Sequence, residues 1–591
     1  MTPDPATTKL PDIALDAPIS DEQRIWLAGY LAGMKAQMGT LAQVAPTQSA
    51  GATLDIVFGS QTGNAEQLAE SAAELASQSG FSPALRCLDD LDMAALASVR
   101  RCLVVVSTYG EGEMPDNAEL FWESLSATTA PRLEQMHYAV LALGDTSYDD
   151  FCEAGKLIDT RFEQLGATRV AARIDCDVDF EDPANDWLEA VLPKVRDTVA
   201  DDELADTASE TPTPTERKKP TWTRKNPYTA QTLENHLLSG ADSAKEIRHF
   251  SFSLGDSGIE YDAGDALCVM PRNCPALVEL LLQRVNATGE EVVAGYDQPL
   301  AQVLQQQLEI VTPPKTLLQW LHDLGADDEL SRVVSNGDKE ALETFLWGRD
   351  TLDLLNLNPA LSISATDLVA CLRPLQHRAY SISSSPLAFP NEIHLTVAAV
   401  RWRNTGREHR GVASTWLADH LQNGDSGRIF LSPNKSFRLP ADGDRPVIMV
   451  GPGTGIAPFR AFLQARHASG AAGKNWLFFG DQHRECDFIY EDEIGEFCSN
   501  GTLTRLDLAF SRDQQEKIYV QQRMRENGKA LYAWLEEGAH FYVCGDATRM
   551  ARDVDQALLD VVRTHGRLTE EDAVAYINQL RRDKRYLRDV Y

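Results

Sequence analysis

Two stretches of the chain alternate short apolar runs with amphipathic segments, and this pattern restricts the fold more than any other feature. Residues 53–195 contain the runs LDIVFG, CLVVVS and YAVLALG, and from Pro446 onward the alternation returns with PVIMV, WLFFG and FYVCG. Short buried strands separated by helical periods are typical of parallel, doubly wound α/β sheets. We therefore predict two such domains in a chain whose 591 residues exceed what one hydrophobic core can organise.

The region between them has a different period. Residues 224–272 and 376–440 show strand-like alternation such as IHLTVAAV, which favours an antiparallel β-barrel, and about 275–372 show helical runs such as KTLLQWLHDL. The polar, Thr- and Pro-rich stretch DDELADTASETPTPTERKKP is typical of a linker. The predicted segments are an N-terminal segment (1–51), a first α/β domain (52–200), a linker (201–223), a barrel domain with a helical insertion (224–440) and a second α/β domain (441–591).

Composition excludes some classes of function. A formal net charge of −33 argues against binding nucleic acid, which requires Lys and Arg to neutralise phosphates. The chain has no run of ~18 apolar residues, and residues 1–16 lack the apolar core of a secretory signal, so we expect no membrane span and a cytoplasmic location. The ten cysteines include no C-x-x-C pair and no cluster of four, so we expect mostly reduced core residues and no metal or iron–sulfur site.

Three loops in the first α/β domain have the chemistry of a ligand site. SQTGNA (60–65) lies between a strand and a helix, where backbone N–H groups and hydroxyls can surround a phosphate, although an ordinary turn is the alternative. The loops that begin at Ser107 (STYGEGEMPDNA) and Leu143 (LGDTSYDDFC) follow the next buried strands, and ligands bind at such strand ends. Tyr109 and Tyr148 could flank a flat ring, or each could simply pack.

The rest of the chain carries a second group of motifs. In RAYS (378–381), Arg378 offers a forked cation to a pyrophosphate, with a surface ion pair as the alternative. GVAS (411–414) begins a helical pattern whose N–H groups could face that pyrophosphate. GPGTGIAPFRAFL (451–463) follows the strand PVIMV but departs from the G-x-G-x-x-G dinucleotide pattern at Pro458. Farther on, Ser511, Arg512 and Lys517 suit a 2′-phosphate, with a solvated charged face as the alternative.

Together these motifs resemble those of the diflavin reductase family. SQTGNA, STYGEG and LGDTSY are similar to its FMN loops, and RAYS with GVAS is similar to the FAD-binding pair of the ferredoxin–NADP reductase superfamily, whose NADPH loop GPGTG resembles. The resemblance implies FMN, FAD and NADPH as cofactors. It also implies a flavodoxin-like FMN domain, an antiparallel β-barrel FAD domain with a helical insertion, and a ferredoxin–NADP reductase-like NADPH domain.

The resemblance assigns site residues position by position. For hydride transfer they are Ser381, Cys544 and Asp589. For FMN they are Ser60, Gln61, Thr62, Gly63, Asn64, Ala65, Ser107, Thr108, Tyr109, Gly110, Leu143, Gly144, Asp145, Thr146, Ser147, Tyr148, Phe151 and Cys152. For FAD they are Arg378, Ala379, Tyr380, Ser381, Thr396, Val397, Ala398, Trp402, Gly411, Val412, Ala413, Ser414 and Tyr591. For NADP they are Gly453, Thr454, Ser511, Arg512, Lys517, Ile518, Tyr519, Val520, Gln521 and Asp553.

Within the family, the chain resembles the flavoprotein (alpha) subunits of NADPH sulfite reductases. It ends in KRYLRDVY with nothing after the aromatic residue, it contains ISDEQRIWLAGYLAGM near its start, and no membrane anchor precedes the FMN loops. The resemblance implies electron transfer from NADPH through FAD and FMN to a hemoprotein (beta) subunit with siroheme and a 4Fe-4S cluster, which reduces sulfite to sulfide for cysteine biosynthesis. It also implies homo-oligomerisation through the N-terminal segment.

Two alternatives remain open at this point. One is another NADPH diflavin reductase that donates electrons to a P450 or other heme protein, because Tyr109 in STYGEG is typical of P450-reductase-like proteins. The other is a flavin-binding sensor without enzymatic activity, which would not need Ser381, Cys544 and Asp589 beside a complete NADPH site. Residues 52–200 contain 27 Asp and Glu against 10 Lys and Arg, a net of −17, which predicts either a docking face for a basic partner or a solvated acidic surface.

Overall fold

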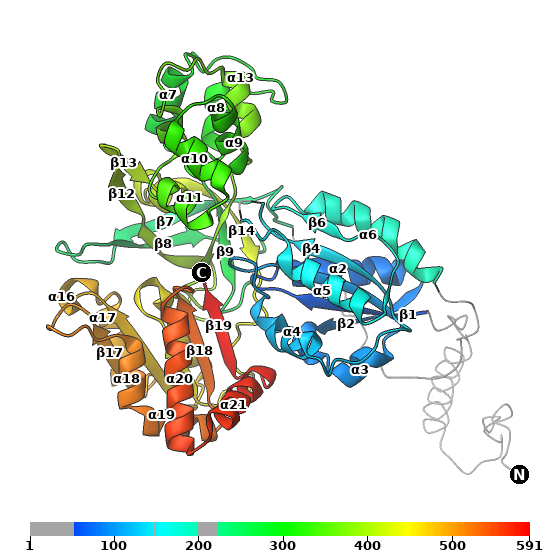
Figure 1. Ribbon diagram of the computed structural model, residues 1–591. Coiled ribbons are helices and arrows are strands. Elements are labelled where there is room, and N and C mark those ends of the chain that lie inside the picture. Colours follow the sequence, from blue (N-terminus) through cyan, green and yellow to red (C-terminus); the bar gives the residue numbers. More distant parts are fainter. Residues whose placement is uncertain (1–51, 147, 199–220) are drawn as a thin grey trace, which may run out of the picture.

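The chain forms three layered units that meet near its C-terminus (Figure 1). The computed structural model describes residues 52–146, 148–198 and 221–591, so the predicted N-terminal segment, Ser147 and most of the predicted linker lie outside the described residues. We call residues 52–198 the first domain, 221–440 the barrel domain and 441–591 the third domain. The exact domain limits stay a prediction.

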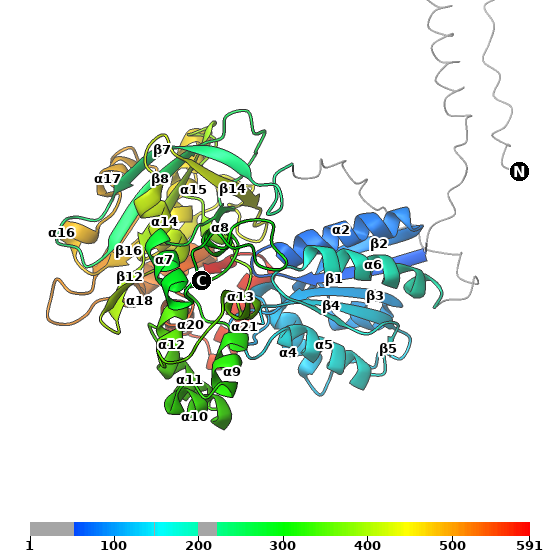
Figure 2. The same ribbon diagram turned by 90° about the horizontal axis from the view of Figure 1, so that it is seen from above.

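The first domain is a parallel sheet with helices on both faces. Its strands run in the order β2-β1-β3-β4-β5, and β6 pairs with β4. Alternate residues of β1 supply the two layers, since Ile56 packs against α2 and α6 whereas Val57 packs on the side of α3, α4 and α5 (Figure 2). The elements are β1 (Ala52–Gly59), α2 (Asn64–Gln78), β2 (Phe81–Cys87), α3 (Met93–Ser98), β3 (Arg101–Ser107), α4 (Glu119–Ser126), β4 (His137–Leu143), α5 (Glu153–Gln164), β5 (Thr168–Arg169), β6 (Ile174–Cys176) and α6 (Glu181–Arg196).

The barrel domain is built on an antiparallel sheet in the order β10-β9-β14-β7-β8-β11. A bridge between Ile382, just after β10, and Leu395 on β11 brings the two outer strands together and closes the sheet. The hairpin β12–β13 extends from it. The strands are β7 (Tyr228–Leu237), β8 (Glu246–Ser253), β9 (Ala266–Met270), β10 (Arg378–Ser381), β11 (Glu392–Ala399), β12 (Arg401–Asn404), β13 (Arg407–Arg410) and β14 (Ser426–Ser432), with α14 (Val412–His420) between β13 and β14.

A helical insertion separates β9 from β10 and forms its own lobe (Figure 1). Its core is almost entirely leucine and valine, including Leu281, Leu304, Leu330 and Leu354. The helices are α7 (Pro275–Arg284), α8 (Leu300–Gln306), α9 (Lys315–Asp323), α10 (Asp328–Asn336), α11 (Lys339–Leu346), α12 (Thr351–Leu355) and α13 (Ala365–Cys371). This lobe matches the insertion that the helical runs predict.

The third domain is a second parallel sheet, in the order β17-β16-β15-β18-β19, which leaves β19 at an edge. Helices α15 and α17 pack on one face, and α18 to α21 pack on the other. Its elements are β15 (Val447–Val450), α15 (Ala457–Ser469), β16 (Asn475–Asp481), α16 (Arg484–Asp487), α17 (Glu491–Ser499), β17 (Arg505–Phe510), α18 (Val520–Glu526), α19 (Gly528–Glu536), β18 (His540–Gly545), α20 (Met550–Gly566), α21 (Glu570–Arg582) and β19 (Tyr586–Val590).

The predicted architecture of two parallel α/β domains around an antiparallel barrel with a helical insertion is confirmed. All ten cysteines are unpaired. Among the helices of the described residues, none combines the length and apolar character that crossing a bilayer requires.

Candidate functional site

The three predicted FMN loops lie together at one edge of the first sheet. They follow the C-terminal ends of β1, β3 and β4, which are adjacent strands. The Gln61 backbone N–H donates to Ser107 Oγ at 3.3 Å, and the Thr108 N–H donates to the Leu143 carbonyl at 2.9 Å. The fold therefore brings the predicted residues of all three loops to one place, except Ser147, which lies outside the described residues.

The SQTGNA loop has the geometry that a phosphate needs. Helix α2 begins after Gly63, which has a left-handed φ of 88° and supplies no side-chain cap. Ser60 Oγ accepts from the Ala65 N–H at 3.2 Å, and the positive end of the helix dipole faces the loop. A Cβ at Gly63 would lie 2.5 Å from the Pro433 carbonyl of the barrel domain, so both the conformation and the close approach require glycine.

Several polar residues that order these loops escaped the sequence predictions. Asn117 Oδ1 accepts from the Ser60 N–H at 2.7 Å, and Asp177 accepts from the Thr146 N–H at 3.0 Å. Gln61 Oε1 accepts from the Asp116 N–H at 2.9 Å. The sequence offers only a short polar residue directly after a strand or within the loop after β3. This pattern is too common to identify these residues.

The two tyrosines of the predicted ring site differ in their surroundings. The Tyr109 hydroxyl donates to the Val590 carbonyl of β19 at 3.2 Å, and its ring packs against the core of the third domain. Tyr148 is 48% exposed. Cys152 is fully buried in a left-handed conformation, with φ of 56°, at the start of α5. The proposed stacking of the two rings on a flavin stays a prediction.

The predicted FAD residues come from β10 and from the start of α14. Tyr380 packs against the barrel core, and Gly411 precedes α14 without a side-chain cap. Arg378 lies 3.4 Å from the largely buried Glu309 carboxylate, measured from Nη2 to Oε2. The Ser414 hydroxyl accepts from the Val400 N–H at 3.1 Å. The start of α14 therefore has no side-chain cap, whereas the Arg378 guanidinium has a carboxylate partner.

Two further predicted FAD residues make polar contacts with other elements. The Thr396 hydroxyl forms a 2.8 Å hydrogen bond with Tyr490 of the third domain. The Trp402 indole donates to the Gly348 carbonyl of the insertion at 2.9 Å and stacks on His409. These contacts give both side chains a structural role, and their predicted contact with FAD stays untested.

The three predicted hydride-transfer residues converge from three strands. Ser381 Oγ on β10 donates to Asp589 Oδ2 on β19 at 2.6 Å, and Cys544 Sγ on β18 donates to the same oxygen at 3.7 Å. Burial raises the pKa of Asp589, while the two hydrogen bonds act in the opposite direction. Burial also raises the pKa of the Cys544 thiol, so it remains a protonated donor. A carboxylate held by two donors thus faces the barrel from the third domain.

The chain end lies beside this carboxylate. The Tyr591 N–H donates to the Gly545 carbonyl at 3.1 Å, and the Ala547 N–H donates to the Tyr591 carbonyl at 3.1 Å. The Tyr591 hydroxyl is 3.0 Å from Thr454 Oγ1, in the predicted NADP loop, and its side chain is 62% exposed. The backbone of the last residue is therefore held in place, whereas its ring is accessible.

The predicted NADP residues lie after the C-terminal ends of β15 and β17, at the start of α18 and, for Asp553, on α20. A Cβ at Gly455 would lie 2.2 Å from the Cys544 carbonyl, so the loop after β15 can approach β18 only because it has no side chain there. After β17, Arg512 and Lys517 are exposed, and in the described part of the chain neither side chain makes a hydrogen bond or ion pair. Gln521 donates to Asp553 at 3.0 Å. The two unpaired cations, Arg512 and Lys517, in the loop after β17 therefore suit a phosphate.

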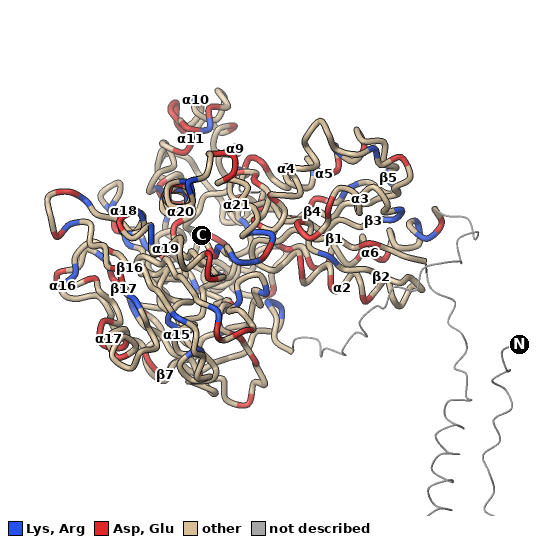
Figure 3. Tube along the Cα trace, turned by 90° about the horizontal axis from the view of Figure 1, so that it is seen from below, with Lys and Arg blue, Asp and Glu red and all other residues tan. Residues whose placement is uncertain are grey.

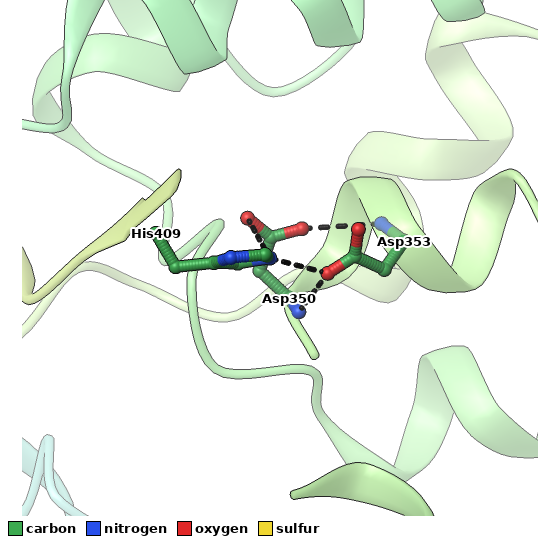
Figure 4. A group of neighbouring side chains, drawn as sticks. All are labelled: Asp350, Asp353 and His409. Atoms are coloured by element: carbon green, nitrogen blue, oxygen red, sulfur yellow. Dashed lines mark hydrogen bonds and ion pairs between the residues drawn. The ribbon is translucent and has the colours of Figure 1, made fainter. Parts of the chain in front are cut away.

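One group of side chains has the composition of a metal site but already contains a cation of its own. Among the described residues, Asp350, Asp353 and His409 place their ligand atoms within 4.8 Å of one another (Figure 4). Arg407 Nη2 lies 2.6 Å from Asp350 and 3.0 Å from Asp353, and His409 Nε2 lies 2.6 Å from Asp353. Because the guanidinium already supplies the positive charge, this group is an ion-pair network that joins α12 to the β12–β13 hairpin.

Several ion pairs join acidic side chains of the first domain to basic side chains of the rest of the chain, and Figure 3 shows where acidic and basic positions meet. They are Lys584–Asp90, Lys339–Glu111, Arg588–Asp116, Arg581–Glu119, Arg373–Asp145, Lys315–Asp149, Arg224–Asp179, Lys225–Asp182 and Lys435–Glu70. In each of these pairs the carboxylate belongs to the first domain. The predicted acidic face therefore already has basic partners within this chain.

Known proteins resemble the chain over nearly its full length. Family models match a flavodoxin at residues 56–190, an FAD binding domain at 220–416 and an oxidoreductase NAD-binding domain at 449–556. The sulfite reductase (NADPH) flavoprotein alpha-component of Bacillus subtilis (strain 168) is 43% identical, covering 97% of this chain and 96% of its own. The proteins of the same name from Shewanella sp. (strain MR-4) and Aliivibrio fischeri are 42% and 40% identical, covering 98% and 97% of this chain and 96% of each relative.

Proposed function

The chain belongs to the sulfite reductase (NADPH) flavoprotein alpha-component family, and on this premise we propose that it transfers electrons from NADPH through FAD and FMN to a sulfite-reducing partner. The observation that carries the proposal is the convergence of Ser381, Cys544 and Asp589 beside the exposed ring of Tyr591. When bound, FAD takes two electrons as a hydride from NADPH, and FMN passes electrons onward singly.

The residues at the convergence point have separate tasks. The Asp589 carboxylate, held by Ser381 and Cys544, favours the positive charge that develops on a nicotinamide as it loses hydride. The Ser381 hydroxyl lies on β10 beside Tyr380, and because its single proton is donated to Asp589, its oxygen could accept a hydrogen bond from the flavin edge.

Anion sites at two helix starts fit the flavin phosphates. The α2 start and the hydroxyls of SQTGNA suit the FMN phosphate, and the α14 start suits the FAD pyrophosphate. For Arg378 to reach that pyrophosphate, its 3.4 Å contact with Glu309 must open. Glu309 keeps other donors when it does, because its Oε1 accepts from the Val311 N–H at 2.8 Å.

Selection of NADPH over NADH belongs to the loop after β17. Arg512 and Lys517 present unpaired charges there, and Ser511 supplies a hydroxyl next to them. A 2′-phosphate would give both cations an anionic partner, which NADH lacks.

The partner is proposed to be a hemoprotein (beta) subunit with siroheme and a 4Fe-4S cluster. The first domain has a net charge of −17 over residues 52–200, and its acidic side chains already pair with Lys and Arg of the same chain. A basic face on the partner would meet the same carboxylates. We also propose a cytoplasmic location, which ten unpaired cysteines support, and assembly into homo-oligomers.

Flavin content and anaerobic reduction by NADPH test this function. Acid extraction and chromatography should give equal amounts of FAD and FMN, and NADPH should bleach the flavin absorbance rapidly. Cleavage near Thr211 should leave FMN on the N-terminal fragment and FAD on the remainder. FAD alone, or flavins that NADPH does not reduce, would reject the proposal. A flavin-binding sensor would contain flavins that NADPH does not reduce.

A further inference from the structure

Strand β19 contacts both the predicted hydride site and the first domain. It is an edge strand, paired on one side with β18 in the register Cys544↔Asp589 and Gly545↔Val590. Asp589 and Tyr591 contact the predicted hydride site, while Arg588 and the Val590 carbonyl contact the first domain. The unpaired side of this edge is therefore covered by the first domain.

The Arg588 contact is the more enclosed of these links. Its Nε lies 3.0 Å from Asp116 Oδ2, and its Nη2 lies 3.0 Å from Glu119 Oε1. The Arg588 side chain is 18% exposed, whereas those of the neighbouring pair Lys584–Asp90 are 66% and 44% exposed. A forked, partly buried guanidinium holds its partners more firmly than a solvated ammonium pair.

The same contact continues into the predicted FMN loops. Asp116 donates its backbone N–H to Gln61 Oε1 at 2.9 Å, and Tyr109 donates to the Val590 carbonyl at 3.2 Å. The loop after β3 thus holds β19 at positions 588 and 590, on either side of Asp589. Departure of the first domain must break both contacts.

We propose that docking of the first domain clamps β19, which makes Arg588 a positioning residue for Asp589 and Tyr591. The inference rests on the proposed function and adds an order of events to it. The hydride site is complete while the first domain is docked. Once that domain swings out to reach a partner, β19 loses its outer contacts, so FAD reduction by NADPH slows until the domain returns.

Hydrogen exchange on the full-length holoprotein tests the clamp without relying on activity. Arg588→Gln should speed exchange of the amides of residues 586–591 by roughly tenfold, because it removes a charge-assisted contact. The double change Asp116→Asn with Glu119→Gln should have the same effect although it lies in the first domain. Lys584→Gln, which removes a solvated ion pair beside β19, should leave these amides unchanged.

Single-turnover reduction of FAD by NADPH then separates positioning from binding. Both sets of variants should slow FAD reduction by roughly tenfold with little change in the NADPH concentration that gives half the maximal rate. Lys584→Gln should behave as the parent chain.

Unchanged exchange of the amides of residues 586–591 in the Asp116/Glu119 double variant would overturn the clamp. Failure of the parent chain to be reduced by NADPH would instead refute the proposed function, and the exchange measurement would still decide whether the first domain holds β19.

Discussion

The Ser381 hydroxyl donates a 2.6 Å hydrogen bond to the Asp589 carboxylate across 208 residues of sequence. The bond crosses from the barrel domain to the third domain, so the predicted hydride site needs these two domains to be packed together. Burial raises the pKa of Asp589, and the donated hydrogen bonds offset part of that rise. The two donors therefore oppose the effect of burial at the carboxylate that we predict lies beside the nicotinamide.

Ser381→Ala should slow FAD reduction by roughly 10- to 100-fold, since a hydrogen bond to a charged group contributes ~1.5–3 kcal/mol. The change also removes an interaction that lowers the pKa of Asp589. The pKa should therefore rise further, and the rate should begin to fall at a higher pH as the solution is acidified. Stopped-flow rates across pH give both quantities. Ser381→Thr, which keeps the hydroxyl, should show the rate and the pH dependence of the parent chain. If the pH at which the rate begins to fall is the same in Ser381→Ala as in the parent chain, Ser381 does not have this role.

Arg512→Gln and Lys517→Gln should each weaken NADPH use by roughly tenfold or more while leaving NADH use nearly unchanged. The reason is that only NADPH has a 2′-phosphate for these unpaired side chains. Steady-state kcat/KM with both nucleotides measures the effect. Arg525→Gln is the matched control, because Arg525 lies on the following helix and pairs with Asp560 instead. Equal losses with both nucleotides would exclude a phosphate contact.

Tyr591→Ala should shift the ratio of the kcat/KM values toward NADH by roughly tenfold, because the predicted stacking of the Tyr591 ring on the flavin would oppose nicotinamide entry by ~0.5–1.5 kcal/mol. NADPH overcomes that barrier through its 2′-phosphate contacts. Tyr591→Phe keeps the ring and loses only the 3.0 Å contact with Thr454, so its nucleotide preference should match that of the parent chain. If the alanine variant loses FAD or stability without a change in preference, the ring only packs the chain end.

The chain should lose stability on acidification through its buried histidines. His249 is 3% exposed, and burial lowers its pKa to about 2, with Arg460 and His394 adding to the shift. A histidine with a lowered folded pKa stabilises the fold above its unfolded pKa of ~6.5 and loses that contribution as pH falls toward the folded value. Its contribution should fall by at most about 1.4 kcal/mol per pH unit.

Thermal unfolding of the parent chain and of His249→Gln between pH 7 and pH 4 checks this effect. Tyr490 hydrogen-bonds the histidine at 2.9 Å, and glutamine can replace that contact. The variant should therefore show a weaker dependence of Tm on pH. Identical pH dependence in the two proteins would show that His249 is not the group responsible.

Local motifs made the ligand loops predictable from sequence. SQTGNA and GPGTG each stand between a strand and a helix within one short segment, so their residues meet whatever the rest of the chain does. Ser381, Cys544 and Asp589 come from three strands, and no spacing connects them, so only the family resemblance could join them. Tyr109 favoured a P450-reductase-like chain, yet the relatives place the protein with sulfite reductases.

Contacts between domains could not be predicted in the same way. Arg588 pairs with Asp116 across 472 residues, and an arginine within RDVY has no local pattern that names its partner. Likewise, the aromatic character of Tyr109 suggested a ring-stacking site, but it gave no sign that the hydroxyl would donate to Val590. Such contacts depend on how folded domains pack against one another. That packing depends on surfaces to which many segments of the chain contribute.

Reconstitution of sulfite reduction is the most direct test of the central claim. The flavin-loaded chain is mixed anaerobically with a siroheme hemoprotein, NADPH and sulfite, and both NADPH oxidation and sulfide are measured. The account predicts sulfide only when both proteins are present, with NADPH consumed in proportion, while the chain alone reduces ferricyanide or cytochrome c but not sulfite. Sulfide production by the chain alone, or no sulfite-dependent NADPH oxidation when both proteins carry their cofactors, would contradict it.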